Sequence, residues 1–163
     1  MNIIFMGTPD FAVGTLDALV EAGHRITLVV TQPDKPRGRG HAMQYTAVKE
    51  AALGHGLPVF QPKRIREEEA VRTLEETEAD VMVVVAFGQL IPEQILRMKK
   101  YGCINVHGSL LPKYRGAAPI QWAILDGEKE TGITTMQMNA GLDTGDILEK
   151  LVLDASNTME DLI

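Results

Sequence analysis

Short apolar runs alternate with segments of helical periodicity along the chain, and this alternation predicts its architecture. Strands are expected over residues 3–6, 26–31, 59–61, 81–86, 133–138 and 147–153, and helices over 11–22, 46–55, 67–76, 92–98 and 117–125. The run over 81–86 is apolar on both faces, which is typical of a central strand in a parallel sheet. The alternation favours an α/β fold with a doubly wound, mostly parallel sheet. The last two strands are expected to pair antiparallel, because their connection is too short for a helical crossover.

Another short apolar run ends in two polar residues, Asn105 and His107. Side chains alternate along a strand, so both are expected to point the same way. The chain then enters a segment interrupted by Gly and Pro. Polar groups on one face at the end of a buried strand are typical of an active site on an open α/β sheet. On spacing alone, catalysis and structural hydrogen bonding remain equal alternatives for this pair.

Composition and charge limit the size of the domain, the expected location in the cell and the class of protein. The chain has 163 residues, enough for one well-cored domain over 1–163, and 45% of them are hydrophobic. No apolar run approaches the ~20 residues of a membrane helix, and the N-terminus is typical of a first strand, so we expect a cytoplasmic protein without membrane partners. A net charge of −6 argues against a protein that coats nucleic acid.

The segment over residues 32–44 is predicted to be a long loop rich in Pro, Gly and Arg. It concentrates positive charge in Lys35, Arg37 and Arg39. On charge alone, a solvated loop is the simpler interpretation.

The sequence gives little support for a dinucleotide-binding site, a metal site or a covalent nucleophile. A dinucleotide site after the first strand would need G-x-G-x-x-G, but Pro9 stands where the second Gly is required. The four histidines (His24, His41, His55 and His107) lack the spacing of zinc ligands, so no metal is expected. Ser109 lies in no nucleophile motif, and Cys103 is expected to pack in the core.

A carboxylate could complete the pair on the strand. Asp143 lies between Gly141 and Gly145, in a segment whose glycines permit close approach to another strand. An Asp that only stabilises a turn is the common alternative. The pattern therefore allows a set of amide, imidazole and carboxylate without proving one.

The residues over 105–112 and 141–146 resemble those of the folate-dependent formyltransferases, which use 10-formyltetrahydrofolate. The resemblance extends over 5–13, 30–34, 58–62 and 115–121, so it covers essentially the whole chain in order. Within that family, the members that formylate methionyl-tRNA are the most similar. The resemblance implies a Rossmann-like catalytic domain that is followed, in full-length members, by a C-terminal β-barrel domain. The chain ends at Ile163 just after a helix start, so we expect a piece of a longer protein that lacks this barrel.

The same resemblance implies roles for particular residues. Asn105, His107 and Asp143 correspond to the catalytic residues of the family. Arg37 and Arg39 lie in the loop that contacts the acceptor end of initiator tRNA. The folate site corresponds to two segments, one lining the pterin pocket (Phe87, Gly88, Gln89, Leu90 and Ile91) and one forming a loop (Ser109, Leu110, Leu111 and Pro112).

The implied reaction is direct transfer of a formyl group. The amine of methionyl-tRNA attacks the formyl carbon on N10 of the folate, and Asn105 with protonated His107 stabilises the oxyanion of the tetrahedral intermediate. Asp143 would orient His107 and help relay the proton. We expect a monomer that uses no metal. Two alternatives stay open: a formyltransferase acting on a small amine such as an amino sugar or glycinamide ribonucleotide, and a folate- or nucleotide-binding module without turnover.

Overall fold

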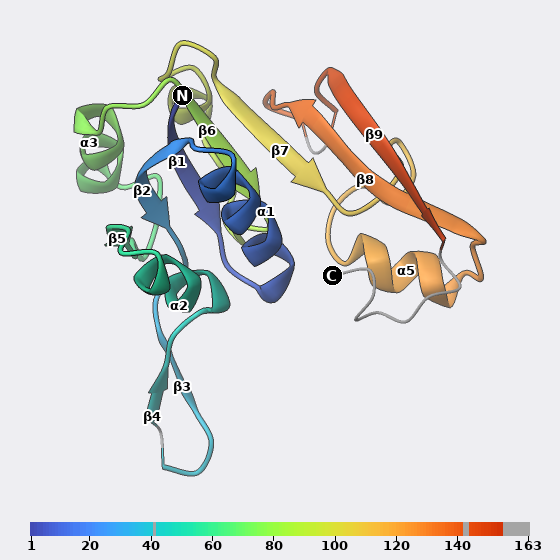
Figure 1. The fold of residues 1–163 in the computed structure, drawn as a ribbon, viewed down its shortest axis with the longest axis horizontal. Coiled ribbons are helices and arrows are strands. Elements are labelled where there is room, and N and C mark those ends of the chain that lie inside the picture. Colours follow the sequence, from blue (N-terminus) through green and yellow to red (C-terminus); the bar gives the residue numbers. More distant parts are fainter. Residues whose placement is uncertain (41, 142–143, 155–163) are drawn as a thin grey trace.

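The computed structural model describes residues 1–40, 42–141 and 144–154 and shows a seven-stranded sheet with helices against it (Figure 1). The strand order is β5-β2-β1-β6-β7-β8-β9. The first five strands of this order (β5, β2, β1, β6 and β7) are parallel to one another. Strands β8 and β9 extend the sheet, each antiparallel to its neighbour before it. The predicted doubly wound, mostly parallel sheet is confirmed, as is the antiparallel pairing of the last two strands. The strands are β1 (Asn2–Gly7), β2 (Arg25–Val30), β5 (Val59–Phe60), β6 (Val81–Val85), β7 (Cys103–His107), β8 (Glu130–Gln137) and β9 (Ile147–Asp154).

Helices cover both faces of the parallel part of the sheet. Strand β1 shows why, because its alternate side chains enter two separate cores. Ile4 and Met6 pack in a cluster with buried residues of α3 and α4, whereas Ile3 and Phe5 pack in a cluster with α1 and α2. The helices are α1 (Asp10–Glu21), α2 (Ala47–Gly54), α3 (Glu68–Glu76), α4 (Glu93–Leu96) and α5 (Pro119–Leu125).

The segment over 32–44 corrects the sequence prediction of a loop. It contains a two-stranded antiparallel hairpin of β3 (Lys35–Arg37) and β4 (Ala42–Gln44), which projects from the body of the molecule (Figure 1). All three residues of β4 are exposed, so this strand has no alternation of buried and exposed positions from which it could have been predicted. Gly38 begins the turn with φ of 76°, a conformation that favours glycine.

Helices α4 and α5 are shorter than the apolar pattern predicts. Helix α4 covers only Glu93–Leu96 of the expected 92–98. Helix α5 begins at Pro119 rather than at 117, because Ala118 adopts a left-handed conformation with φ of 55°. Proline is favoured at this first helical position, since its missing N–H has no partner to lose there.

Gly7 allows the turn after β1 to pack against β6 and α1, and we predict that Gly7→Ala destabilises the fold. A Cβ at Gly7 would lie 2.7 Å from the Val85 carbonyl oxygen and 2.8 Å from the Ala12 Cβ. Overpacking of this kind costs about 1–3 kcal/mol. The measurement is urea unfolding, with Gly14→Ala as the matched control.

Gly14 lies within α1, and a Cβ there meets nothing within 4 Å. The control should stabilise the protein by about 0.5–1 kcal/mol, because alanine is the better helix former. Equal effects of the two substitutions would contradict the packing described for Gly7.

Candidate functional site

Strand β7 brings Asn105 and His107 to one face at its carboxyl end. The exposed fractions are 8% for Asn105 and 7% for His107. The strand register places Met136 of β8 opposite Asn105 and Thr134 opposite His107. The predicted common direction of the two side chains agrees with the alternating burial of β7. An amide and an imidazole therefore lie buried at the edge where ligands bind in open α/β sheets.

The segment after β7 folds back onto His107. The His107 Nε2 lies 2.7 Å from the Tyr114 carbonyl oxygen. Because a carbonyl oxygen only accepts, Nε2 is the nitrogen that carries the hydrogen and donates. Tyr114 itself adopts φ of 55°, in the left-handed region, so the backbone here is held in an unusual conformation.

The Tyr114 side chain fixes this segment to the residues that follow α5. Its hydroxyl oxygen lies 2.8 Å from Asp126 Oδ2 and 3.1 Å from Glu128 Oε1. Desolvation, together with hydrogen bonds to these two carboxylates, raises the pKa of Tyr114 well above its usual value. The hydroxyl thus remains protonated and donates over the ordinary pH range. Sequence reasoning missed this residue, because its role depends on a contact between segments.

Ser109 anchors the loop that was expected to bind folate. Its Oγ donates to the Lys113 carbonyl oxygen at 2.6 Å, and its own carbonyl oxygen accepts from Thr134 Oγ1 at 2.7 Å. The Thr134 hydroxyl also accepts from the Leu111 N–H at 3.1 Å. Ser109 is fully buried and Leu111 nearly so. These bonds fix the loop against β8 and give the serine a structural role.

Cys103 packs in the core as predicted. It is fully buried in the cluster with α3 and α4, and burial raises the pKa of its thiol to about 12. A thiol with this pKa is not a nucleophile at neutral pH.

The segment over 87–91 follows β6 and is tied to two neighbouring strand ends. The Phe87 carbonyl oxygen accepts from Thr8 Oγ1 at 2.8 Å and from Gln32 Nε2 at 3.2 Å. Gln89 Oε1 accepts from the Ile65 N–H at 2.7 Å, so the segment is held from both sides. Leu90, in contrast, is 87% exposed. The loop is therefore held by hydrogen bonds to the Phe87 backbone and the Gln89 side chain, and it presents an apolar side chain to the outside.

Asp143, the predicted carboxylate partner, lies outside the described residues. Nearby, Asn139 Oδ1 accepts from the Gly141 N–H and from Thr144 Oγ1, both at 2.9 Å. Its role with His107 stays a prediction. Arg37 lies in β3 and Arg39 in the exposed turn of the hairpin, which forms a two-stranded sheet separate from the one that contains β7.

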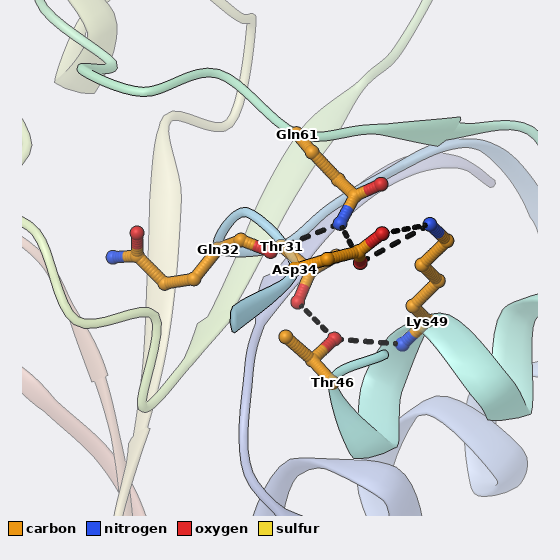
Figure 2. A network of polar contacts seen from close by, with 6 residues as sticks. All are labelled: Thr31, Gln32, Asp34, Thr46, Lys49 and Gln61. Atoms are coloured by element: carbon orange, nitrogen blue, oxygen red, sulfur yellow. Dashed lines mark hydrogen bonds and ion pairs between the residues drawn. The ribbon is translucent and has the colours of Figure 1, made fainter. Parts of the chain in front are cut away.

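A polar network that sequence reasoning missed fixes the base of the hairpin (Figure 2). Asp34 accepts two hydrogen bonds from Lys49 Nζ, at 2.9 and 3.1 Å, and one from Gln61 Nε2 at 2.7 Å. Thr46 caps α2 by accepting from the Lys49 N–H, and its hydroxyl lies 2.7 Å from that of Thr31. The signal in the sequence that could have indicated this network is the position of Asp34, a charged residue shortly after the end of β2.

This network predicts a pH-dependent contribution to stability. Hydrogen bonds from Gln61 and Lys49 lower the pKa of Asp34 below its unfolded value. The stabilisation is therefore present above the unfolded pKa of about 3.9 and is lost as the pH falls through the folded pKa. We expect Asp34→Asn to lower the free energy of unfolding at pH 7 and to have a diminishing effect below pH 4. Urea unfolding of both proteins across this range measures it, and a pH-independent difference would contradict the assignment.

The described residues hold neither a metal-binding cluster nor a membrane-spanning helix. In residues 1–40, 42–141 and 144–154, no group of three or more His, Cys, Asp or Glu side chains is arranged to hold a metal ion. Across the same ranges, every helix is too short or too polar to cross a bilayer.

Comparison with known proteins places the chain in a family. A sequence profile described as formyl transferase matches residues 1–162. The chain belongs to the formyl transferase family. Methionyl-tRNA formyltransferase of Agathobacter rectalis is 63% identical over 150 residues, which cover 92% of the chain and 48% of the relative. That of Lachnospira eligens is 61% identical over 160 residues, covering 97% and 51%. The chain thus spans about half the length of these curated relatives.

Solved structures of formyl transferases share the fold. Phosphoribosylglycinamide formyltransferase from Bacillus halodurans superposes with a TM-score of 0.77 at 24% identity, over 99% of this chain and 85% of that one. Glycinamide ribonucleotide transformylase 1 from Geobacillus kaustophilus gives a TM-score of 0.74 at 26% identity, over 99% and 87%. The chain therefore shares its overall fold with these two formyl transferases.

Proposed function

We propose that the protein transfers the formyl group of 10-formyltetrahydrofolate to the amino group of methionyl-tRNA, the initiator form, for translation initiation. The observation that carries the proposal is the buried amide and imidazole of Asn105 and His107, side by side along one face at the carboxyl end of β7. The named relatives at 61–63% identity support the choice of acceptor. We expect the protein to work as a cytoplasmic monomer.

The segments that we assign to the donor suit a flat heterocycle with polar edges. The assignment comprises Phe87, Gly88, Gln89, Leu90 and Ile91, with Ser109, Leu110, Leu111 and Pro112. Gly88 has φ of 95°, and a Cβ there would lie 3.0 Å from Gln32 Nε2, so the backbone approaches its neighbours closely. The backbone N–H and C=O groups at Gly88 offer hydrogen bonds to a ligand, and the exposed Leu90 side chain offers it an apolar contact. The donor supplies the activated formyl group when bound.

Asn105 and His107 are assigned to the formyl oxygen. As the acceptor nitrogen bonds to the formyl carbon, negative charge develops on the formyl oxygen of the tetrahedral intermediate; the charge is lost again when the intermediate collapses and the bond from that carbon to N10 breaks. The Asn105 amide N–H and a His107 N–H donate to this oxygen, as in an oxyanion hole. In the structure the His107 Nε2–H donates to the Tyr114 carbonyl oxygen. If this N–H is the one that donates to the formyl oxygen, it must first release the Tyr114 carbonyl.

The proton released by the acceptor amine has to reach N10 of the donor. We assign this relay to His107 together with Asp143, whose carboxylate would orient the imidazole and favour its charged form. No covalent enzyme intermediate is needed, which agrees with the structural roles of Ser109 and Cys103.

A panel of acceptors tests the proposal. The chain is supplied with 10-formyltetrahydrofolate and methionyl-tRNA, glycinamide ribonucleotide or an amino sugar, alone and with the segment corresponding to the remaining half of a curated relative. We expect formyl-methionine in the tRNA reaction. Transfer to a small amine without any formyl-methionine would overturn the acceptor assignment.

Arg37 and Arg39 of the hairpin are assigned to the tRNA acceptor arm, and Arg39→Ala tests this. The exposed arginine is expected to contact a phosphate, so the variant should raise the KM for methionyl-tRNA and leave folate affinity unchanged. The dependence of log Kd on log salt should become shallower by about one unit. Arg72→Ala in α3 is a suitable control, since the Arg72 guanidinium lies 3.3 Å from the Glu68 carboxylate of its own helix and far from the hairpin in sequence. An unchanged KM and salt slope would argue against the assignment.

A further inference from the structure

The side chain of Gln32 reaches from the end of β2 to the segment that we assign to the donor. Gln32 lies two residues after β2 (Arg25–Val30), and its Nε2 donates to the Phe87 carbonyl oxygen at 3.2 Å. Its Oε1 accepts from Gln89 Nε2 at 3.0 Å. We propose that Gln32 is a positioning residue of the donor site, which holds residues 87–91 in the conformation that binds folate. The inference rests on the proposed function, which assigns this segment to the donor.

The backbone of the segment adopts a conformation that has to be held. Ala86 has φ of 49° and Gly88 has φ of 95°, so left-handed residues stand on both sides of Phe87. For alanine this conformation is sparsely populated and persists only where surrounding contacts fix it. The Phe87 carbonyl oxygen accepts from Thr8 Oγ1 at 2.8 Å as well as from Gln32, so both of its lone pairs are used. These two bonds therefore set the orientation of the peptide between Phe87 and Gly88.

Gln89 ties the same amide to a second part of the chain. Its Oε1 accepts from the Ile65 N–H at 2.7 Å, and its Nε2 donates to the Lys63 carbonyl oxygen at 3.2 Å as well as to Gln32. The Gln32 amide thus joins the Phe87 backbone to the Gln89 side chain, donating to one and accepting from the other. Only a side chain with both a donor and an acceptor can serve both partners.

Gln32 is itself held in place by the network of Figure 2. Its carbonyl oxygen accepts from Gln61 Nε2 at 3.1 Å, and Gln61 also donates to Asp34 at 2.7 Å. The preceding residue, Thr31, is fully buried, and its hydroxyl oxygen lies 2.7 Å from that of Thr46. In Figure 2 the Gln32 side chain extends away from these partners. A fixed backbone therefore presents the amide to the segment after β6.

This arrangement lowers the cost of binding the donor. A segment that is already in its binding conformation loses less entropy when the ligand binds, so preorganisation raises affinity. Without the Gln32 amide, the donor has to order the peptide at Gly88 as it binds. We expect the effect on binding rather than on the chemical step, because the side chains assigned to the formyl oxygen, Asn105 and His107, lie on β7.

Titration calorimetry of the 163-residue chain with 10-formyltetrahydrofolate, with no acceptor present, tests the inference. Gln32→Met keeps the length of the side chain and removes both hydrogen-bonding groups, so it should raise the Kd about tenfold. Gln32→Glu keeps the acceptor for Gln89 but turns a carboxylate oxygen toward the Phe87 carbonyl oxygen, and should raise the Kd at least as much. Thr8→Val, which removes the other bond to that carbonyl, should act in the same direction.

Gln137→Met is the matched control. The Gln137 Nε2 donates to the carbonyl oxygens of Tyr101 and Cys103 at 3.0 and 3.1 Å, beside Gly102 with φ of 66°. It thus has the same kind of partners as Gln32, but at the amino end of β7. The control should lower the free energy of unfolding in urea, as Gln32→Met does, and leave the Kd for 10-formyltetrahydrofolate unchanged.

An unchanged Kd in both Gln32 variants, or an equal rise in Gln137→Met, would overturn the inference. In the transfer reaction Gln32→Met should raise the KM for the donor and leave kcat unchanged, and a fall in kcat with an unchanged donor KM would also overturn it. Failure of the proposed function gives a different result, since the chain then binds the donor in a Gln32-dependent manner and transfers no formyl group to methionyl-tRNA.

Discussion

Asn105→Ala is expected to lower the rate of formyl transfer by about 10²–10³-fold, the loss typical of removing one oxyanion-hole donor. The side chain is 8% exposed at the carboxyl end of β7, so its amide acts in a site from which water is largely excluded. Charge develops on the formyl oxygen during transfer, and the missing donor matters most at that moment. Single-turnover kinetics with 10-formyltetrahydrofolate and methionyl-tRNA measure the loss, and folate affinity should be largely retained.

Thr131→Val is the matched control for this experiment. Thr131 of β8 is also buried, at 4% exposure, and its hydroxyl has no hydrogen-bond partner among the described residues. Replacing it by an isosteric apolar side chain should leave transfer unchanged and stabilise the fold by about 1 kcal/mol. If Asn105→Ala lost folate binding together with turnover, Asn105 would have a structural role and not the one assigned here.

His107→Ala is expected to cost about 10²–10⁴-fold in transfer rate, since the imidazole is assigned both to the formyl oxygen and to proton relay. Because Asn105 and His107 would act on the same developing charge, the doubly substituted protein should lose less than the product of the two single losses. The measurement is again the single-turnover rate, with folate Kd determined in parallel.

His107→Gln separates a structural role from a chemical one. A glutamine amide can donate to the Tyr114 carbonyl oxygen and so preserve the 2.7 Å contact that holds the following segment. It cannot act as a protonated imidazole. We expect His107→Gln to remain folded and to be as slow as His107→Ala, whereas near-complete recovery of transfer would show that His107 only positions the segment.

The sheet could be predicted because each of its strands carries a local signal. The run over 81–86 is apolar on both faces, and β6 is indeed buried throughout between two helical layers. Asn105 and His107 could be placed on one face by the period of a strand alone. The chemical roles that we propose for these side chains rest on the family resemblance and not on spacing.

The features that were missed depend on contacts between distant segments. All three residues of β4 in the hairpin are exposed, so no alternation of buried and exposed positions marks that strand. The Asp34 network joins residues 15 and 27 positions away, Lys49 and Gln61, which meet only once β2, α2 and β5 are assembled. Likewise, the contact between His107 and the Tyr114 carbonyl needs a backbone turn whose left-handed residue is a tyrosine, which local preference disfavours.

We propose that the side chains at the carboxyl end of β7 catalyse direct transfer of a formyl group to the amine of an aminoacylated RNA. The most direct test supplies 10-formyltetrahydrofolate labelled with ¹³C in its formyl group, together with methionyl-tRNA, to the chain joined with the remaining half of a curated relative. NMR then follows the label. We predict that it appears in the N-formyl group of methionine, with one tetrahydrofolate formed for each label transferred. Label that appears only as free formate, or that stays on the folate, would contradict the account.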